Sequence, residues 1–213
     1  MKTMTAFRAA IEKAPIVPVL TVYEADHAEP LAEALAKGGL TAVEVTLRTP
    51  AALDVIRIMG EAQPDLLVGA GTIISEGDVD AALKAGSDFL VTPGTSPLLL
   101  DALGNHDGVI LPGVSTTSEA MARFDEGYGV MKFFPAEAAG GANFLKSLSG
   151  PLPHMDFMPT GGITPRNAGD YLSLPNVIAV GGSWLATKDE MAKGDWAAIV
   201  EKAKDAVRIG RGA

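Results

Sequence analysis

The stretch FLVTPGTSPLLLDALGNHDGVILPGV, residues 89–114, holds two short apolar runs with a helix-like segment between them. The runs begin at Phe89 and Val109, and residues 96–104 between them are rich in leucine and alanine. Continuous apolar runs of this kind are typical of parallel strands that are covered on both faces. The stretch therefore predicts a strand–helix–strand unit of a parallel sheet.

The same unit recurs along the chain. Apolar runs start 20 to 26 residues apart, near Ile16, Ala42, Leu66, Phe89, Val109, Val130, Asp156 and Val177. Helix-like segments follow them at residues 26–38, 50–62, 75–85, 96–104, 117–127, 141–149, 165–173 and 195–208. Regular alternation of strand and helix indicates an α/β fold. Eight such units fit a (β/α)8 TIM barrel, with one extra N-terminal helix within Met1–Lys13.

An open doubly wound sheet is the competing architecture. It would usually carry a glycine-rich dinucleotide fingerprint after its first strand, and residues 21–26 contain no glycine. Glycine and proline instead gather where many of the expected strands end, as in GAGT (69–72), PG (93–94) and PTGG (159–162). In a barrel these positions share the C-terminal rim, where active sites lie. Some of them serve only as turns.

Composition limits the remaining possibilities. The chain has 213 residues, 47% of them hydrophobic and 20% charged, and we expect residues 1–213 to form a single barrel domain. No apolar stretch approaches the roughly 20 residues of a membrane span, and the N-terminus lacks a signal-peptide core, so we expect a cytoplasmic protein with no membrane partner. A net charge of -9 argues against nucleic acid as a partner, because binding a polyanion relies on lysine and arginine. The chain has no cysteine, which excludes disulfides and cysteine nucleophiles.

The segment VMKFFPAE, residues 130–137, sets a lysine in the middle of an apolar strand pattern. Side chains alternate between the two faces of a strand, so Lys132 shares a face with Val130 and Phe134. An ammonium group beneath the helices would have no route to water. We therefore expect Lys132 to point into the barrel.

The run AVEVTLR, residues 42–48, sends a second ionisable group to the same place. Its valines must meet the helices, so Glu44, Thr46 and Arg48 face the interior, with Arg48 nearest the C-terminal rim. Glu44 favours the charged form of Lys132, whereas burial and Arg48 favour the neutral amine. The sequence leaves the balance between these effects open.

Two structural explanations compete with a catalytic role. A lysine at a strand end can extend its amine to solvent, and a Glu44–Lys132 ion pair could serve only to fix the strand register. An apolar pair would fix the register with a smaller desolvation penalty. The combination of Lys132, Glu44 and Arg48 therefore favours a functional site.

These three groups suit chemistry on a keto acid. Lys132 would attack the ketone, Glu44 would move protons, and Arg48 would hold the substrate carboxylate. A phosphate site is expected nearby, because barrels commonly bind phosphate in the loops after strands seven and eight. Those loops contain Thr160-Gly161-Gly162 and Gly181-Gly182-Ser183.

Seven motifs of the sequence are similar to those of a known protein family. They are VEVTLRT (43–49), GAGT (69–72), PG (93–94), LPGVST (111–116), KFFPAE (132–137), PTGGI (159–163) and GGSW (181–184). Together they resemble the class I 2-keto-3-deoxy-6-phosphogluconate (KDPG) aldolase / 4-hydroxy-2-oxoglutarate aldolase family. The likeness implies a homotrimeric lyase of the Entner–Doudoroff pathway that cleaves KDPG to pyruvate and glyceraldehyde 3-phosphate. It also implies side activity on 4-hydroxy-2-oxoglutarate, with neither a metal nor an organic cofactor.

The resemblance assigns a role to each matched position. It implies that Lys132 forms the Schiff base and that Glu44 is the general acid and base. Further substrate contacts are implied at Arg48 and Thr72 for the pyruvate carboxylate, at Pro93 and Phe134 for the pocket wall, at Thr160 beside the imine, and at Gly161, Gly162, Gly182 and Ser183 for the phosphate.

Three alternatives stay open. A metal-dependent aldolase or epimerase would need converging ligands, yet the three histidines, His27, His106 and His154, lie far apart and none ends an expected strand. A non-catalytic barrel that binds phosphorylated metabolites would need the glycine pairs but not the lysine, glutamate and arginine together. An aldolase for the galactonate-derived epimer would differ only in contacts to one hydroxyl.

Overall fold

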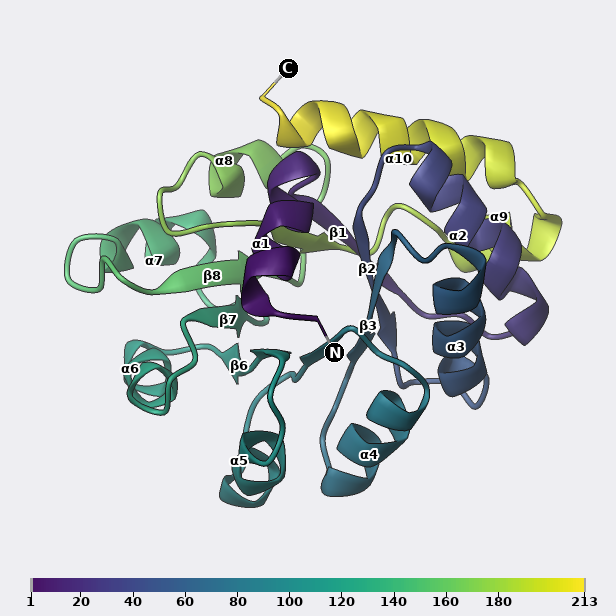
Figure 1. The fold of residues 1–213 in the computed structure, drawn as a ribbon. Helices are drawn as coiled ribbons and strands as arrows, with labels where there is room; N and C mark the ends of the chain where they lie inside the picture. Colours follow the sequence, from purple (N-terminus) through teal and green to yellow (C-terminus); the bar gives the residue numbers. More distant parts are fainter. Residues whose placement is uncertain (1, 213) are drawn as a thin grey trace.

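The computed structural model describes residues 2–212 and shows strands alternating with helices around a central axis (Figure 1). The strands are β1 Ile16–Leu20, β2 Ala42–Thr46, β3 Leu67–Gly71, β4 Phe89–Val91, β5 Val109–Leu111, β6 Gly113–Val114, β7 Val130–Phe133, β8 Asp156–Pro159 and β9 Val180–Gly182. The helices are α1 Met4–Lys13, the short 3-10 helix η1 Ala25–His27, α2 Ala28–Lys37, α3 Ala52–Ala62, α4 Glu76–Lys84, α5 Pro97–Gly104, α6 Thr117–Asp125, α7 Gly141–Leu148, α8 Ala168–Leu172, α9 Lys188–Lys193 and α10 Trp196–Gly210.

The parallel strands close into a barrel. Two sheets, in the orders β5-β4-β3-β2-β1-β9 and β6-β7-β8, follow one another around the ring. Strands β5 and β6 are separated only by Pro112, whose carbonyl accepts a hydrogen bond from the Lys132 amide at 2.9 Å. The other seam is bridged between Thr160 and Gly181. Since β5 and β6 together occupy one position, the predicted (β/α)8 barrel is confirmed.

The C-terminal part of the chain differs in detail from the expectation. The last strand begins at Val180 rather than near Val177, and the described part of the chain contains α9, which the sequence analysis missed. This helix is short, and it is defined by its ends: Thr187 and Glu190 form a capping box, and Gly194 stops it in the left-handed conformation. Six helical residues carry too little apolar periodicity to be recognised from sequence.

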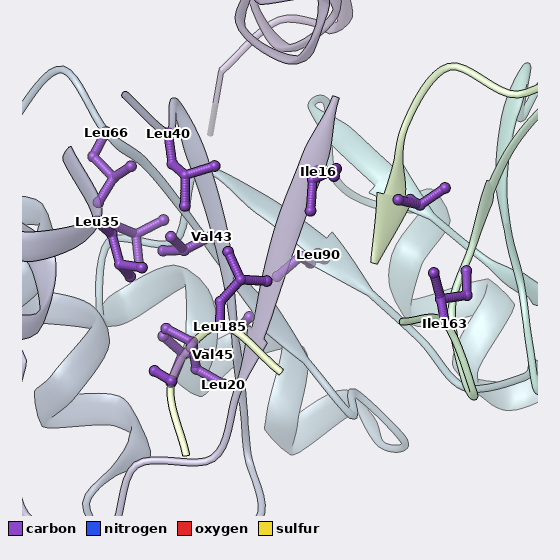
Figure 2. Close-up of a cluster of buried hydrophobic side chains, with 14 of the residues drawn as sticks. Ile16, Leu20, Leu35, Leu40, Val43, Val45, Leu66, Leu90, Ile163 and Leu185 are labelled. Carbon is purple, nitrogen blue, oxygen red and sulfur yellow. The ribbon is translucent and has the colours of Figure 1, made fainter. Parts of the chain in front are cut away.

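The described residues pack in two apolar layers. Outward-facing side chains of the strands, such as Val43 and Val45, meet the helices, as Figure 2 shows beside Leu35 and Leu185. A smaller cluster fills the barrel interior toward the N-terminal ends of the strands. Its members are Val17, Ala42, Leu67, Phe89, Val91, Val109, Leu111, Val130, Met158 and Ala179, with Phe7 and Ile11 of α1.

Helix α1 closes the N-terminal end of the barrel (Figure 1). Its Phe7 ring lies 5.0 Å from the ring of Phe89, measured between centroids, and is fully buried. Arg8 contacts Asp156 of β8 at 2.6 Å between Nη2 and Oδ2. Solvent is therefore kept from this end, and access to the interior is left to the C-terminal rim.

No helix among residues 2–212 has both the length and the apolar character that crossing a bilayer requires.

The role of α1 can be tested by shortening its central aromatic side chain. Phe7→Ala should lower the free energy of unfolding by about 3–5 kcal/mol, because it leaves a cavity against Phe89. Leu53→Ala on α3, where the side chain is 36% exposed, should change it by less than about 1 kcal/mol. Urea denaturation followed by far-UV circular dichroism measures the free energy of unfolding of both variants. Equal losses in Phe7→Ala and Leu53→Ala would show that α1 is not part of the core.

Candidate active site

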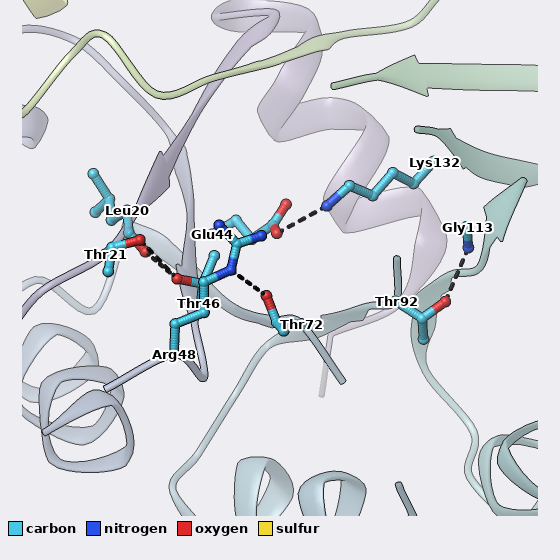
Figure 3. A network of polar contacts seen from close by, with 9 residues as sticks. All are labelled: Leu20, Thr21, Glu44, Thr46, Arg48, Thr72, Thr92, Gly113 and Lys132. Carbon is cyan, nitrogen blue, oxygen red and sulfur yellow. Dashed lines mark hydrogen bonds and ion pairs between the residues drawn. The ribbon is translucent and has the colours of Figure 1, made fainter. Parts of the chain in front are cut away.

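The expected ionisable groups meet inside the barrel. Lys132 Nζ on β7 lies 3.2 Å from Glu44 Oε1 on β2, and the two residues are 3% and 0% exposed (Figure 3). They come from strands on different sides of the ring, 88 residues apart in sequence. The prediction that both side chains point inward is therefore confirmed.

The second carboxylate oxygen of Glu44 and the hydroxyl of Thr160 have no hydrogen-bond partner in the described part of the chain. Glu44 Oε2 and Thr160 Oγ1 are both buried without a hydrogen bond. An unpaired buried polar atom costs about 1–3 kcal/mol, so such atoms at the centre of a barrel mark a place for a polar ligand. The ring of Phe134 also borders the amine, with Lys132 Nζ 5.2 Å from the ring centroid.

Glycines on the inward face of the strands make room for this centre. A Cβ atom on Gly71 would lie 2.0 Å from Glu44 Oε1, and one on Gly181 would lie 2.2 Å from Thr160 Oγ1. One on Gly113, which pairs with Lys132, would meet the Pro93 carbonyl carbon at 2.3 Å. The sequence analysis interpreted these glycines as part of the rim. All three lie within strands: Gly71 and Gly181 leave space for the side chains of Glu44 and Thr160, and Gly113 allows the backbone at Pro93 and Gly94 to approach closely.

Arg48 and Thr72 meet at the C-terminal end of β2 and β3. Arg48 Nε donates to Thr72 Oγ1 at 3.1 Å, as drawn in Figure 3. The expectation that Arg48 faces the interior is wrong: β2 ends at Thr46, so Arg48 lies in the turn beyond the strand and is exposed at the rim. Thr72 has φ of 63°, which is strained for a β-branched residue. Strain of about 1–3 kcal/mol is retained where the surrounding structure fixes the residue. Here it aims the Thr72 hydroxyl at Arg48.

The two glycine-containing loops lie next to one another, because Thr160 bridges to Gly181. Gly161 and Gly162 have φ of 103° and 78°, a conformation that favours glycine. Gly182 is fixed by a different neighbour: a Cβ atom there would lie 1.9 Å from the ring of Trp184.

The remaining predicted positions lie on the same rim. Pro93 follows β4, and Ser183 follows β9 with an exposed side chain. Together with Phe134, Pro93 lines a cavity of about 100 Å³. The structure thus brings every predicted site residue to the interior or the C-terminal rim of one barrel. In the described chain, residues 2–212, no group of three or more His, Cys, Asp or Glu side chains is arranged to hold a metal ion.

An α/β barrel with a buried lysine beside a carboxylate at its centre defines a class of enzymes that use the amine as a nucleophile. Comparison with known proteins identifies the family. The family model for KDPG and KHG aldolase matches residues 7–202.

Named relatives and solved structures agree with this family model. The 2-dehydro-3-deoxy-phosphogluconate aldolase of Pseudoalteromonas atlantica is 50% identical over 91% of this chain and 90% of its own. The KHG/KDPG aldolase of Escherichia coli is 41% identical over 95% of both chains. The crystal structure of KDPG aldolase from Legionella pneumophila, with pyruvate captured as a covalent carbinolamine intermediate, superposes with a TM-score of 0.88 at 42% identity, covering 92% of this chain and 96% of that one. The chain belongs to the KDPG and KHG aldolase family.

The space left by Gly71 can be tested directly. Gly71→Ala should displace the Glu44 carboxylate and lower kcat for aldol cleavage at least about 100-fold, the usual range for loss of a general acid or base. Gly60→Ala is the matched control, because a Cβ atom there meets nothing within 4 Å. It should keep full activity and stabilise α3 by about 0.5–1 kcal/mol. Steady-state kinetics and thermal unfolding give both values, and an active Gly71→Ala variant would show that the position of Glu44 is not critical.

Proposed function

We propose that this chain is a class I aldolase that cleaves KDPG to pyruvate and glyceraldehyde 3-phosphate, with Lys132 as the Schiff-base residue. The observation that carries the proposal is the buried 3.2 Å contact between Lys132 Nζ and Glu44 Oε1 at the sealed centre of the barrel. The relative from Legionella pneumophila, which holds pyruvate as a covalent carbinolamine, supports the same chemistry here.

The reaction follows from the two groups. Glu44 accepts a proton from the Lys132 ammonium, and the neutral amine then attacks the C2 carbonyl of the keto acid. Glu44 returns that proton to the hydroxyl of the carbinolamine, and loss of water gives a protonated imine. Glu44 takes the proton of the C4 hydroxyl, the C3–C4 bond breaks, and its electron pair moves into the imine to form an enamine. Glyceraldehyde 3-phosphate leaves at this stage. Glu44 then returns the proton to C3 of the enamine, which restores the protonated imine. Addition of water to this imine releases pyruvate and restores the amine.

The other rim residues fit the two ends of the substrate. The Arg48 guanidinium, oriented by Thr72, offers a planar contact for the pyruvate carboxylate. Phe134, whose ring lies near Lys132 Nζ, and Pro93, which lines a cavity with Phe134, offer apolar surface for the substrate. The buried Thr160 hydroxyl, which has no partner among the described residues, follows β8 directly. Gly161, Gly162, Gly182 and Ser183 provide backbone amides and a hydroxyl for the phosphate. A KDPG aldolase from Zymomonas mobilis, solved with 3-phosphoglycerate, is 42% identical and supports a phosphate-containing ligand here.

The relatives also guide the choice of substrate. A solved structure described as KDPGal is only 26% identical, whereas relatives named for the phosphogluconate reaction reach 50%. We therefore assign the gluconate-derived epimer. The name of the Escherichia coli relative, KHG/KDPG aldolase, supports a side activity on 4-hydroxy-2-oxoglutarate.

Chemical trapping tests the nucleophile. Sodium borohydride with pyruvate should reduce the imine and leave a stable adduct on Lys132, detected by peptide mass spectrometry. Lys132→Ala should form no adduct and lose at least about 1000-fold in kcat, because covalent catalysis requires the amine. Lys146→Ala, which changes an exposed lysine of α7, should keep both properties. A fully active Lys132→Ala variant, or an adduct on another lysine, would refute the mechanism.

The homotrimer implied by the resemblance is a further part of this proposal. Two exposed apolar side chains, Ile74 and Leu98, line one depression near the starts of α4 and α5, with exposures of 64% and 84%. Apolar groups of this kind are buried in stable oligomers.

Light scattering after size-exclusion chromatography tests the assembly. The native chain should elute as a trimer, because burial of Ile74 and Leu98 would stabilise the interface. Leu98→Asp should shift the mass toward that of the 22.0 kDa monomer, whereas Lys84→Asp, an exposed position at the far end of α4, should not. A native chain that is monomeric at micromolar concentration would contradict the trimer, and a trimeric Leu98→Asp variant would place the interface elsewhere.

A further inference from the structure

Glu137 is a charged residue of the KFFPAE segment that the mechanism above does not use. Its backbone amide donates to the Gly161 carbonyl at 3.1 Å, which joins the loop after β7 to the loop after β8. Its side chain packs directly against Gly162, because a Cβ atom on that glycine would lie 2.6 Å from Glu137 Cγ. A negative side chain therefore borders the loop that is proposed to bind a phosphate.

Two neighbours lie against one carboxylate oxygen of Glu137, whose side chain is exposed. The Tyr171 hydroxyl of α8 donates to Glu137 Oε1. The same oxygen lies beside Gly141, where a Cβ atom would be only 3.5 Å away, at the first residue of α7. The positive end of a helix stabilises a carboxylate at this position.

Tyr171 is suited to hold this carboxylate. The tyrosine is 1% exposed, and burial together with Glu137 raises the pKa of its phenol. The phenol therefore stays protonated and acts as a donor over the whole working pH range. Glu137 also lines a surface groove between α7 and α8, together with Lys146, Asn167 and Asp170.

The position of this charge matters for a phosphorylated substrate. A carboxylate and a phosphate dianion repel each other over distances below the Debye length of about 8 Å. A carboxylate released from its partners can also accept hydrogen bonds from the Gly161 and Gly162 amides, in competition with the substrate. On the other side of the loop, Asn167 Nδ2 donates to the Gly162 carbonyl at 3.3 Å. The loop is thus fixed from two sides, and only one side carries a charge.

We infer that Tyr171 is a positioning residue for the phosphate end of the substrate, because its hydroxyl holds the Glu137 carboxylate against α7 and away from the Gly161–Gly162 amides. The inference rests on the proposed function, since it requires that these amides bind the substrate phosphate. It predicts that the charge of Glu137, rather than its packing, becomes harmful when Tyr171 loses its hydroxyl.

The experiment separates binding at the phosphate end from chemistry at Lys132. Tyr171→Phe should raise KM for KDPG about three- to tenfold, with kcat and the yield of the borohydride–pyruvate adduct within twofold of the native values. Glu137→Gln should leave KM unchanged or lower it. In the double variant Tyr171→Phe/Glu137→Gln, KM should return to within twofold of the native value. High salt should reduce the effect of Tyr171→Phe, because the repulsion is screened. Tyr128→Phe, at a half-buried tyrosine after α6, is the matched control and should change nothing.

Every other outcome contradicts the inference, and each one identifies the step that is wrong. If the double variant is as impaired as Tyr171→Phe, or if Glu137→Gln alone raises KM, the pair is a structural brace and the charge has no role. If Tyr171→Phe leaves KM unchanged, the hydroxyl does not position Glu137. If the native protein itself forms no adduct with pyruvate, the proposed function fails, and this inference fails with it.

Discussion

The contact between Lys132 and Glu44 is the constraint on which the rest of the barrel depends. Removing two charges from water is expensive, and their mutual attraction repays that penalty only when the geometry is accurate. The 3.2 Å separation requires β7 and β2 to keep their register across the full width of the barrel. The apolar layer around Phe89 and the closing helix α1 support this geometry, because both keep water from reaching the pair from the N-terminal side of the barrel.

Glycine is the second requirement of the site, and it follows from the first. A barrel of eight strands has just enough interior for the side chains that fill it. The side chains of Glu44 and Thr160 occupy the space that a Cβ atom on Gly71 or Gly181 would need, and the backbone at Pro93 occupies the space beside Gly113. Their conformations are ordinary for strands, so the absence of a side chain is what matters at these three positions.

Much of this arrangement could be predicted from the sequence, because two periodic patterns carry it. The spacing of apolar runs predicted the barrel, and the alternation of side chains placed Lys132 and Glu44 inside it. The patterns have no information on contacts between strands that are distant in the chain. The space that Gly71 leaves for Glu44, the short helix α9 and the link between Tyr171 and Glu137 all depend on such contacts or on capping geometry.

The centre and the rim of the site have opposite electrostatic requirements. At the centre, a buried amine needs a carboxylate close by, so that the charged form is tolerated and protons have a carrier. At the rim, the phosphate site that we propose needs amides and hydroxyls but no carboxylate. The segment from Lys132 to Glu137 contributes to both ends within six residues. Strand β7 places Lys132 inside the barrel, and the turn that follows β7 places Glu137 against Gly162 of the proposed phosphate loop. The hydroxyl of Tyr171 and the start of α7 hold the charge of Glu137 there.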